Sequence, residues 1–299
     1  MKQIRYFLEY IIAYPFFIFV RIIGIDSASA IGSFLAKSIG PLTSAHKIAQ
    51  KNLNIAFPKL SKNEQAKILI GMWDNLGRTI AEMPHIHTMS DKAFESRVTR
   101  VTNSKIKNLS SKKATICVSG HFGNWETAAR AIIPFNDKIS IIYRDANNPF
   151  LNKEYLEMRN DRFSNIAKGH RGVRDIILAV KNKNFVCFLA DQKLNQGISV
   201  NFFNRPAMTA KAPVNLALKF GLPILLVHSI RTQGANFKVY IDGPYELDDL
   251  VKNLDQHQSI EDKELVLTQK INDIIENWVK DNPSQWFWVH RRWDKDFYL

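Results

Sequence analysis

Short apolar runs, each bounded by polar residues, recur along the middle of the chain and predict buried β-strands. They cover residues 114–119, 139–143, 185–190 and 223–230. A run of this length without polar alternation is typical of a strand that is covered on both faces of its sheet. Residues 237–241 alternate between apolar and polar side chains, which predicts an antiparallel edge strand.

Helical patterns separate these runs. The predicted helices cover residues 27–57, 125–133, 150–162, 173–181, 210–220 and 259–280. In addition, Ser61 and Glu64 form a capping box, which predicts a helix from there to about Met83, just before Pro84. Buried strands that alternate with helices predict an α/β fold, with a mixed, mostly parallel central sheet flanked by helices.

The N-terminal segment is amphiphilic. Residues 10–20 form its apolar centre, which contains Pro15, a poor helix former. Lys2, Arg5 and Arg21 flank that centre. A helix that spans a bilayer needs roughly 20 apolar residues, so this segment is borderline. We expect a membrane-associated helix over residues 1–25 and a single α/β domain over residues 26–299. Spanning the bilayer, lying in its interface and packing as an ordinary buried helix all remain open at this point.

Composition narrows the class of partner. The 299 residues contain 41 Lys and Arg against 28 Asp and Glu, a net charge of +13, which favours an anionic partner. The excess lies in the first two-thirds of the chain, whereas residues 242–282 are acidic. With only two cysteines, the chain is neither a disulfide scaffold nor a Cys-rich zinc module. No nucleic-acid-binding motif accompanies the basic region, so we expect no nucleic-acid partner.

Candidate chemistry gathers where the predicted strands end, since parallel sheets place their sites at the carboxyl ends of the strands. The sharpest segment is SGHFGNWE, residues 119–126, in which His121 follows a strand and Glu126 opens the next helix. The intervening turn would fold the carboxylate back toward the imidazole, which is the equipment of a general base. The alternative is that His121 is a turn residue and Glu126 merely complements the helix dipole. We expect no metal, because too few ligands are spaced to hold one.

At this point the chain resembles a known family, the late lipid A biosynthesis acyltransferases of bacteria, within the glycerophosphate-acyltransferase-like superfamily. Residues 119–126 are similar to the family's His-x4-Asp/Glu block. Further blocks follow in the same order: Tyr-Arg at 143–144 with Asn-Asn-Pro at 147–149, a basic helix opening at 169–181, Asp-Gln at 191–192 with VNFFNRPAMT at 200–209, and NPSQWFWVHRRW at 282–293. Asn204 departs from the pattern, which usually has glycine there.

The resemblance implies roles for individual residues. His121 would be the general base toward an acceptor hydroxyl, and Glu126 would orient it. A second set would bind substrate or the developing oxyanion: Arg144, Arg171, Asp191 and Gln192. For each member of this set the alternative is an ordinary surface or capping residue.

The implied reaction is transfer of a fatty acyl chain from acyl carrier protein to a hydroxyl of a lipid A precursor, with no metal or organic cofactor. The implied location is the cytoplasmic face of the inner membrane, where the partners are the acidic carrier protein, an anionic lipid acceptor and the bilayer. An acyltransferase of the same mechanism that acts on another membrane lipid or glycolipid is the nearest alternative. A hydrolase, or a non-enzymatic binder that uses the positive charge, is more distant.

Overall fold

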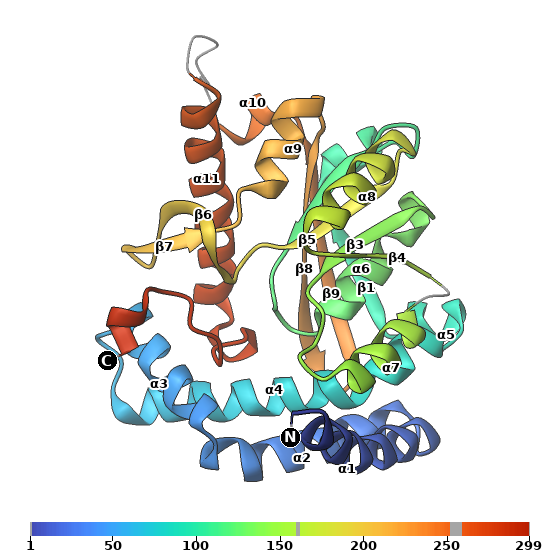
Figure 1. The fold of residues 1–299 in the computed structure, drawn as a ribbon, viewed down its shortest axis with the longest axis vertical. Helices are drawn as coiled ribbons and strands as arrows, with labels where there is room; N and C mark the ends of the chain where they lie inside the picture. The colour runs from blue at the N-terminus through green and yellow to red at the C-terminus, as the bar shows by residue number, and fades with distance from the viewer. Residues whose placement is uncertain (1, 160–161, 252–258, 299) are drawn as a thin grey trace.

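A seven-stranded sheet forms the centre of the molecule (Figure 1), in the computed structural model, which describes residues 2–159, 162–251 and 259–298. Its strand order is β1-β9-β8-β2-β5-β3-β4. The strands are β1 (Val98–Thr102), β2 (Thr115–Ser119), β3 (Ile139–Tyr143), β4 (Ser164–Ala167), β5 (Phe185–Leu189), β8 (Ile224–Gln233) and β9 (Asn236–Tyr245). A separate antiparallel ribbon consists of β6 (Lys193–Phe202) and β7 (Arg205–Thr209).

The direction of the strands confirms the predicted mixed, mostly parallel sheet. Strands β8, β2, β5, β3 and β4 all run parallel, and β9 runs antiparallel to β8. The strand predicted at 237–241 is antiparallel as expected, but the prediction that it forms the edge is wrong. Strand β1 pairs outside it. Only Val98 of β1 is buried, so this strand lacks the apolar signal that marks its neighbours.

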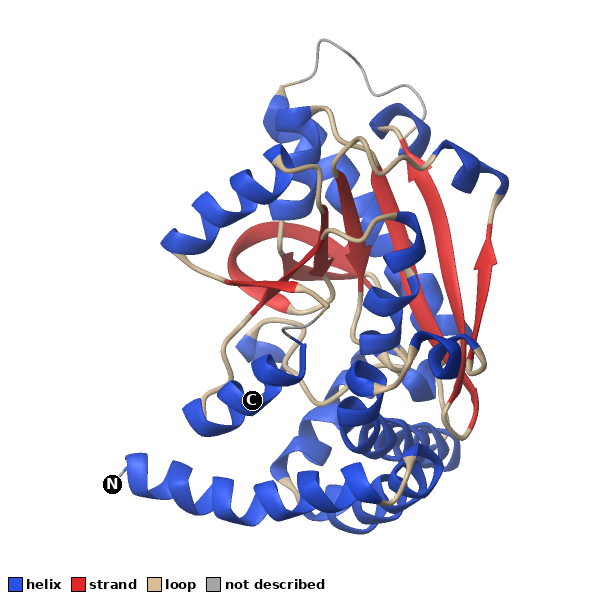
Figure 2. Ribbon diagram, turned by 90° about the vertical axis from the view of Figure 1, so that its right-hand side faces the viewer, coloured by secondary structure: helices blue, strands red, loops and turns tan. Residues whose placement is uncertain are grey.

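Helices cover both faces of the sheet (Figure 2). They are α5 (Asp91–Glu95), α6 (Trp125–Ala131), α7 (Pro149–Arg159), α8 (His170–Lys181), α9 (Ala212–Phe220), α10 (Leu247–Leu250) and α11 (Ile260–Asp281). Alternate residues of β2 point to opposite sides. Val118 packs in one apolar core with residues of α8, α9 and α11, whereas Cys117 packs in a second core with residues of α5 and α6. Burial on both faces explains why the central strands are continuously apolar.

Four helices form an N-terminal layer at one end of the molecule (Figure 1): α1 (Lys2–Ile22), α2 (Ile25–Ile39), α3 (Ser44–Ala56) and α4 (Lys62–Thr88). The helix predicted over 27–57 is in fact divided, because a 3₁₀ turn at Gly40–Leu42 separates α2 from α3. Helices α2 and α4 approach closely at Gly32 and Gly77. A Cβ atom on Gly32 would lie 2.2 Å from the carbonyl oxygen of Gly77.

Helix α4 begins as predicted but ends later. The Ser61 hydroxyl accepts a hydrogen bond from the Glu64 backbone N–H, and the Glu64 carboxylate accepts one from the Ser61 N–H, at 2.8 Å. The predicted end before Pro84 is wrong, since α4 continues to Thr88. Side-chain bonds hold this last turn: His85 Nε2 lies 2.6 Å from the carbonyl oxygen of Val20, and His87 bonds to a carboxylate of α6.

Candidate active site

His121 lies in the turn that follows β2, beside the end of β5. Because Ser119 and Leu189 are register partners on these neighbouring parallel strands, the residues just after them meet. The Nδ1 atom of His121 lies 2.8 Å from Oδ1 of Asp191, and the His121 backbone N–H donates to Oδ2 of the same carboxylate, at 2.7 Å. The His121 side chain is 18% exposed, so the imidazole is held from behind while part of it faces solvent.

Asp191 is completely buried and carries a charge. Its Oδ2 also accepts a hydrogen bond from Nε1 of Trp286, at 2.8 Å. Burial alone would raise the pKa of the carboxyl, but the nearby His121 and these hydrogen bonds outweigh it and hold the pKa of Asp191 well below its usual range. An ionised carboxylate at Nδ1 favours a proton on that nitrogen, which leaves Nε2 as the basic atom of His121.

Glu126 occupies a different network, which corrects the expectation that it orients His121. Its Oε2 lies 2.8 Å from Nε2 of His87, its Oε1 accepts from the hydroxyl of Tyr155 at 3.0 Å, and Arg159 donates to both oxygens. The carboxylate is fully buried; burial would raise its pKa, but Arg159 and His87 hold the pKa well below its usual range. The first turn of α6 points this side chain toward α4 and α7, so both of its oxygens are engaged away from His121.

The residues around Glu126 escaped the sequence analysis. His87 is part of a His-x-His pair that has no further ligand-spaced histidine beside it. Tyr155 and Arg159 lie on α7, whose polar sequence is typical of a surface helix. The Arg159 side chain is only 4% exposed, and nothing in its local sequence indicates burial. Its partner is 33 residues away, which puts the pairing beyond any local motif.

The other predicted site residues lie on neighbouring strand ends. Gln192 is adjacent to Asp191, and its Nε2 lies 3.4 Å from Nε2 of His121. Arg144 follows β3 and is exposed. Lys168, which no sequence pattern singled out, follows β4 and is an exposed residue. Partial desolvation of its ammonium group, together with the charge of Arg144, lowers its pKa, while Asp191 opposes the shift. Lys168 therefore lies within electrostatic reach of Asp191, and Arg144 lies within electrostatic reach of Lys168.

Arg171 stays a prediction. Its backbone belongs to the first turn of α8, but its side chain lies outside the described residues. Among the described residues, no group of three or more His, Cys, Asp and Glu side chains is arranged to hold a metal ion.

The C-terminal segment closes the site from behind. Trp286, Trp288 and Trp293 are at most 1% exposed, so these side chains form a buried cap on the core. Phe287 and Trp125 flank the His121 imidazole, with ring centroids 5.7 and 5.3 Å from it. The segment thus supplies both the indole that fixes Asp191 and one wall beside the base.

Arg292 belongs to this cap. It is fully buried, and it donates to the hydroxyl of Thr209 at 2.7 Å and to the side-chain oxygen of Asn272 at 3.1 Å. Burial lowers the pKa of Arg292 to about 10. Its guanidinium joins the end of the chain to β7 and α11.

The arrangement is that of a general base held by a buried carboxylate. Asp191 fixes the orientation and tautomer of His121 and stabilises the imidazolium that forms when Nε2 takes a proton. The aromatic walls exclude water from one side of the base, and cations lie nearby for an anionic group. An arrangement of this kind can remove a proton from a hydroxyl.

Comparison with known proteins identifies relatives. Residues 1–295 match the family described as bacterial lipid A biosynthesis acyltransferase. The lipid A biosynthesis palmitoleoyltransferase of Escherichia coli K12 is 24% identical over 270 residues, which cover 87% of this chain and 83% of the relative. The lipid A biosynthesis lauroyltransferase of the same organism is 22% identical over 252 residues, covering 82% and 78%. A lipid A biosynthesis acyltransferase of Haemophilus influenzae is 23% identical over 251 residues, covering 82% and 76%.

Among solved structures, the 1-acyl-sn-glycerophosphate acyltransferase PlsC of Thermotoga maritima is similar, with a TM-score of 0.38 and 16% identity. The match covers 85% of this chain and 96% of that one.

Proposed function

This chain belongs to the bacterial lipid A biosynthesis acyltransferase family, and from that premise we propose that it transfers a fatty acyl chain from acyl carrier protein to a hydroxyl of a lipid A precursor. One observation carries the proposal at the chemical level: the imidazole of His121 is held by the buried, ionised carboxylate of Asp191. A hydroxyl acceptor needs such a base, because an alcohol is a weak nucleophile until its proton is removed.

In the proposed reaction, Nε2 of His121 takes the proton of the acceptor hydroxyl as the oxygen attacks the thioester carbonyl. The carbon–sulfur bond of the resulting tetrahedral intermediate then breaks. The imidazolium returns its proton to the departing sulfur, which leaves as the thiol of the carrier. The charge on Asp191 stabilises the imidazolium between these two steps.

Lys168, within electrostatic reach of Asp191, and Arg144, near Lys168, supply positive charge on this side of the site. We assign to them the phosphate of the acceptor or the oxyanion of the intermediate, since both ligands are anionic and accept charge-assisted hydrogen bonds. The net charge of +13 supports the same type of acceptor and an acidic carrier protein as donor.

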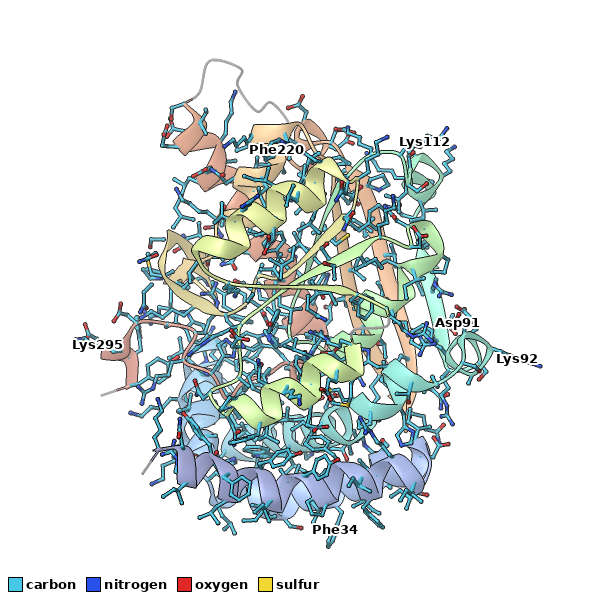
Figure 3. All side chains as sticks on the ribbon, turned by 45° about the vertical axis from the view of Figure 1, so that its right-hand side comes forward. Phe34, Asp91, Lys92, Lys112, Phe220 and Lys295 are labelled. Carbon is cyan, nitrogen blue, oxygen red and sulfur yellow. The ribbon has the colours of Figure 1, made fainter. Side chains whose placement is uncertain are left out.

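Membrane attachment is proposed through the N-terminal layer. Helix α1 is long and apolar enough to cross a membrane by length and composition, and only 11% of its most apolar 18-residue stretch is buried. Its exposed large apolar side chains are Ile4, Phe7, Leu8, Ile11, Ile12, Ile18, Phe19 and Ile22. Helix α2 adds Phe34, which is 67% exposed and points away from the body of the molecule (Figure 3). Apolar area of this extent is typical of a surface that contacts lipid.

We accordingly propose residues 1–25 as the membrane-associated helix and residues 26–299 as the catalytic domain, located at the cytoplasmic face of the inner membrane. Gly24, with a φ of +76°, lies close to this boundary and separates α1 from α2. Contacts of α1 with α7 favour attachment along the surface of the domain. The Tyr10 hydroxyl donates to Glu154 at 3.1 Å, and Asn148 Nδ2 donates to the carbonyl oxygen of Tyr6 at 2.8 Å.

The test is expression of the chain in a host that lacks its own late lipid A acyltransferases, followed by mass spectrometry of the lipids. We expect lipid A species that are heavier by one fatty acyl group, and none with His121→Ala. A purified-enzyme assay with acyl carrier protein or coenzyme A thioesters then identifies the donor. Acylation of a phospholipid or ornithine lipid, with lipid A unchanged, would contradict the proposed acceptor.

A further inference from the structure

The turn that carries His121 is held from below by polar side chains of α4. Gly123 has a φ of +54°, and a Cβ atom there would lie 2.1 Å from the carbonyl oxygen of Ser229. Its own carbonyl oxygen accepts hydrogen bonds from Asn75 Nδ2 at 2.9 Å and from Thr79 Oγ1 at 3.1 Å. The neighbouring Asn124 side chain caps α6 by accepting from the Glu126 N–H.

Two charged residues lie under these contacts. Glu82 of α4 is fully buried and forms an ion pair with Arg231 of β8, which is 8% exposed. Arg231 donates to both oxygens of the carboxylate, and its Nε donates to the Asn75 side-chain oxygen at 2.9 Å. Glu82 Oε2 in turn accepts from Asn124 Nδ2 at 2.9 Å. The pair therefore reaches the turn through Asn75 on one side and Asn124 on the other.

We propose that the Glu82–Arg231 ion pair is the positioning pair for the His121 turn. It sets the backbone of residues 123–124 and, through that backbone, the place of the imidazole opposite Asp191. This inference rests on the proposed acyl transfer only for its kinetic readout, because the placement of the turn is measurable without a substrate.

Stability alone is a poor reason for such a pair. Removing two charges from water is unfavourable, and apolar residues of similar volume often stabilise a core at least as well. The ion pair contributes fixed geometry instead. A planar guanidinium binds a carboxylate and an amide in defined directions, which a methyl or methylene group does not. General-base catalysis needs this precision, since a displacement of about 1 Å costs about 100-fold in rate.

The same carboxylate also touches the N-terminal layer. Ser29, on the buried side of α2, donates from its hydroxyl to Glu82 Oε1 at 2.6 Å, and Arg78 donates to that hydroxyl at 3.1 Å. Ser33, one turn further along α2, donates instead to Asp74, which pairs with Arg78. Ser29 and Ser33 therefore form a matched pair of hydroxyls, and only the Ser29 hydroxyl bonds to the positioning pair.

The first experiment compares Glu82→Gln with Leu267→Ala, a truncation of a buried α11 side chain that destabilises the core but removes no polar contact of the turn. Hydrogen exchange of the peptide containing residues 119–126 is measured in both proteins and in the wild type. We expect exchange there to accelerate about tenfold in Glu82→Gln, with β9 unchanged, and the turn to stay protected in Leu267→Ala. Equal protection of the turn in Glu82→Gln and the wild type would overturn the proposal.

Kinetics provide the second readout, as ratios to a wild-type enzyme that has been shown to transfer acyl groups. Glu82→Gln should lower kcat about tenfold or more with KM within threefold, because substrate contacts are untouched while the base is displaced. Arg231→Lys keeps the charge but loses the fork, so an intermediate kcat is expected. A KM effect alone would contradict positioning. If the wild type is inactive, the proposed function fails, and the exchange experiment still decides the placement of the turn.

Ser29→Ala is a milder variant that tests the same proposal if Glu82→Gln does not fold. It removes one hydrogen bond and leaves no charge unpaired, so the fold should persist. We expect kcat to fall about two- to fivefold and turn exchange to rise, while Ser33→Ala matches the wild type. Identical behaviour of the two serine variants, in both kcat and exchange, would overturn the proposal.

Discussion

Two buried carboxylates lie on either side of the same turn, and they do different work. Asp191 and Glu126 are both fully buried, and the groups that contact them hold the pKa of each well below its usual range. Asp191 bonds to an imidazole that is 18% exposed, whereas Glu126 bonds to Arg159 and to His87, whose side chain is completely buried. A carboxylate supports proton transfer only when its partner reaches the substrate, so accessibility of the partner separates a catalytic pair from a structural one.

The difference also shows in the charge balance. Glu126 is neutralised by a bidentate guanidinium, which cannot give up a proton at neutral pH. Asp191 faces an imidazole, a group that can both accept and donate a proton. The Glu126 cluster therefore holds α6 against α4 and α7, and the Asp191 cluster holds the imidazole that we propose as the general base.

The largest effect is expected from removing the base. His121→Ala should reduce kcat by about 1,000-fold, within the range that general acid–base catalysis contributes. Asp191→Asn should reduce kcat by about 100-fold, because an amide neither favours the reactive tautomer nor stabilises an imidazolium. Initial rates with a thioester donor measure both, and circular dichroism checks folding. Wild-type turnover in either variant would remove the pair from the mechanism.

The next effect falls on stability. Glu126→Gln leaves the buried guanidinium of Arg159 uncompensated, and we expect a loss of about 3–5 kcal/mol in the free energy of unfolding, measured by urea denaturation. Activity should fall with the folded fraction and with the displacement of α6.

A double variant sharpens this second prediction. Glu126→Gln with Arg159→Met removes the orphaned charge and should recover most of the lost stability. A single variant as stable as the wild type, or a double variant no more stable than the single, would show that Glu126 is not a structural carboxylate.

Acid should destabilise the protein before either carboxylate takes up a proton. Burial lowers the pKa of His228 and of His290 to about 4. In the unfolded chain these histidines bind protons below about pH 6.5, while the folded protein resists protonation until about pH 4. The unfolded state thus holds more protons in this window, so stability is complete above pH 6.5 and is lost progressively as the pH falls toward 4.

The carboxylates behave differently. Their pKa values are lowered by folding, so the stability they contribute is lost only below about pH 4, where the unfolded chain begins to protonate them. His228 stacks on Trp278 and Tyr240, with centroids at 4.2 and 4.8 Å, and His228→Phe keeps that stack. Urea titrations at pH 7 and 5 should show a smaller difference for this variant than for the wild type. An unchanged difference would contradict the assignment to His228.

Much of this architecture is predictable from the sequence, wherever the local residue pattern favours the same element as the packing of the whole domain. Residues 139–143 form β3 as predicted, and the Ser61–Glu64 box opens α4, because burial and capping each leave a local pattern. Strands β6 and β7 were not predicted, since β6 contains Gly197 and β7 contains Pro206, which are typical of loops. Their pairing is supported from outside by Gln269 of α11, which exchanges hydrogen bonds with the backbone of β6.

The site was predicted in part, for a related reason. The sequence placed His121 and Asp191 at the ends of separate strands and did not pair them; the parallel neighbours β2 and β5 bring the two residues to one edge of the sheet. The choice of Glu126 as partner relied on sequence proximity, which does not fix the direction in which the first turn of a helix points. That direction is set by Arg159 and His87, which lie 33 and 39 residues away.

The smallest effect is expected at Arg144, and it contrasts an exposed arginine with the buried Arg159. Arg144→Lys keeps the positive charge but replaces a planar fork by a point charge, so kcat/KM should fall about three- to tenfold with stability unchanged. Arg159→Lys should do the reverse, because the bidentate bonds to Glu126 hold the fold, and its melting temperature should drop while the KM of the folded enzyme persists. Steady-state kinetics and thermal melts on the two variants measure both. Full activity in Arg144→Lys would remove this arginine from substrate binding, and leave Lys168 as the cation beside the base.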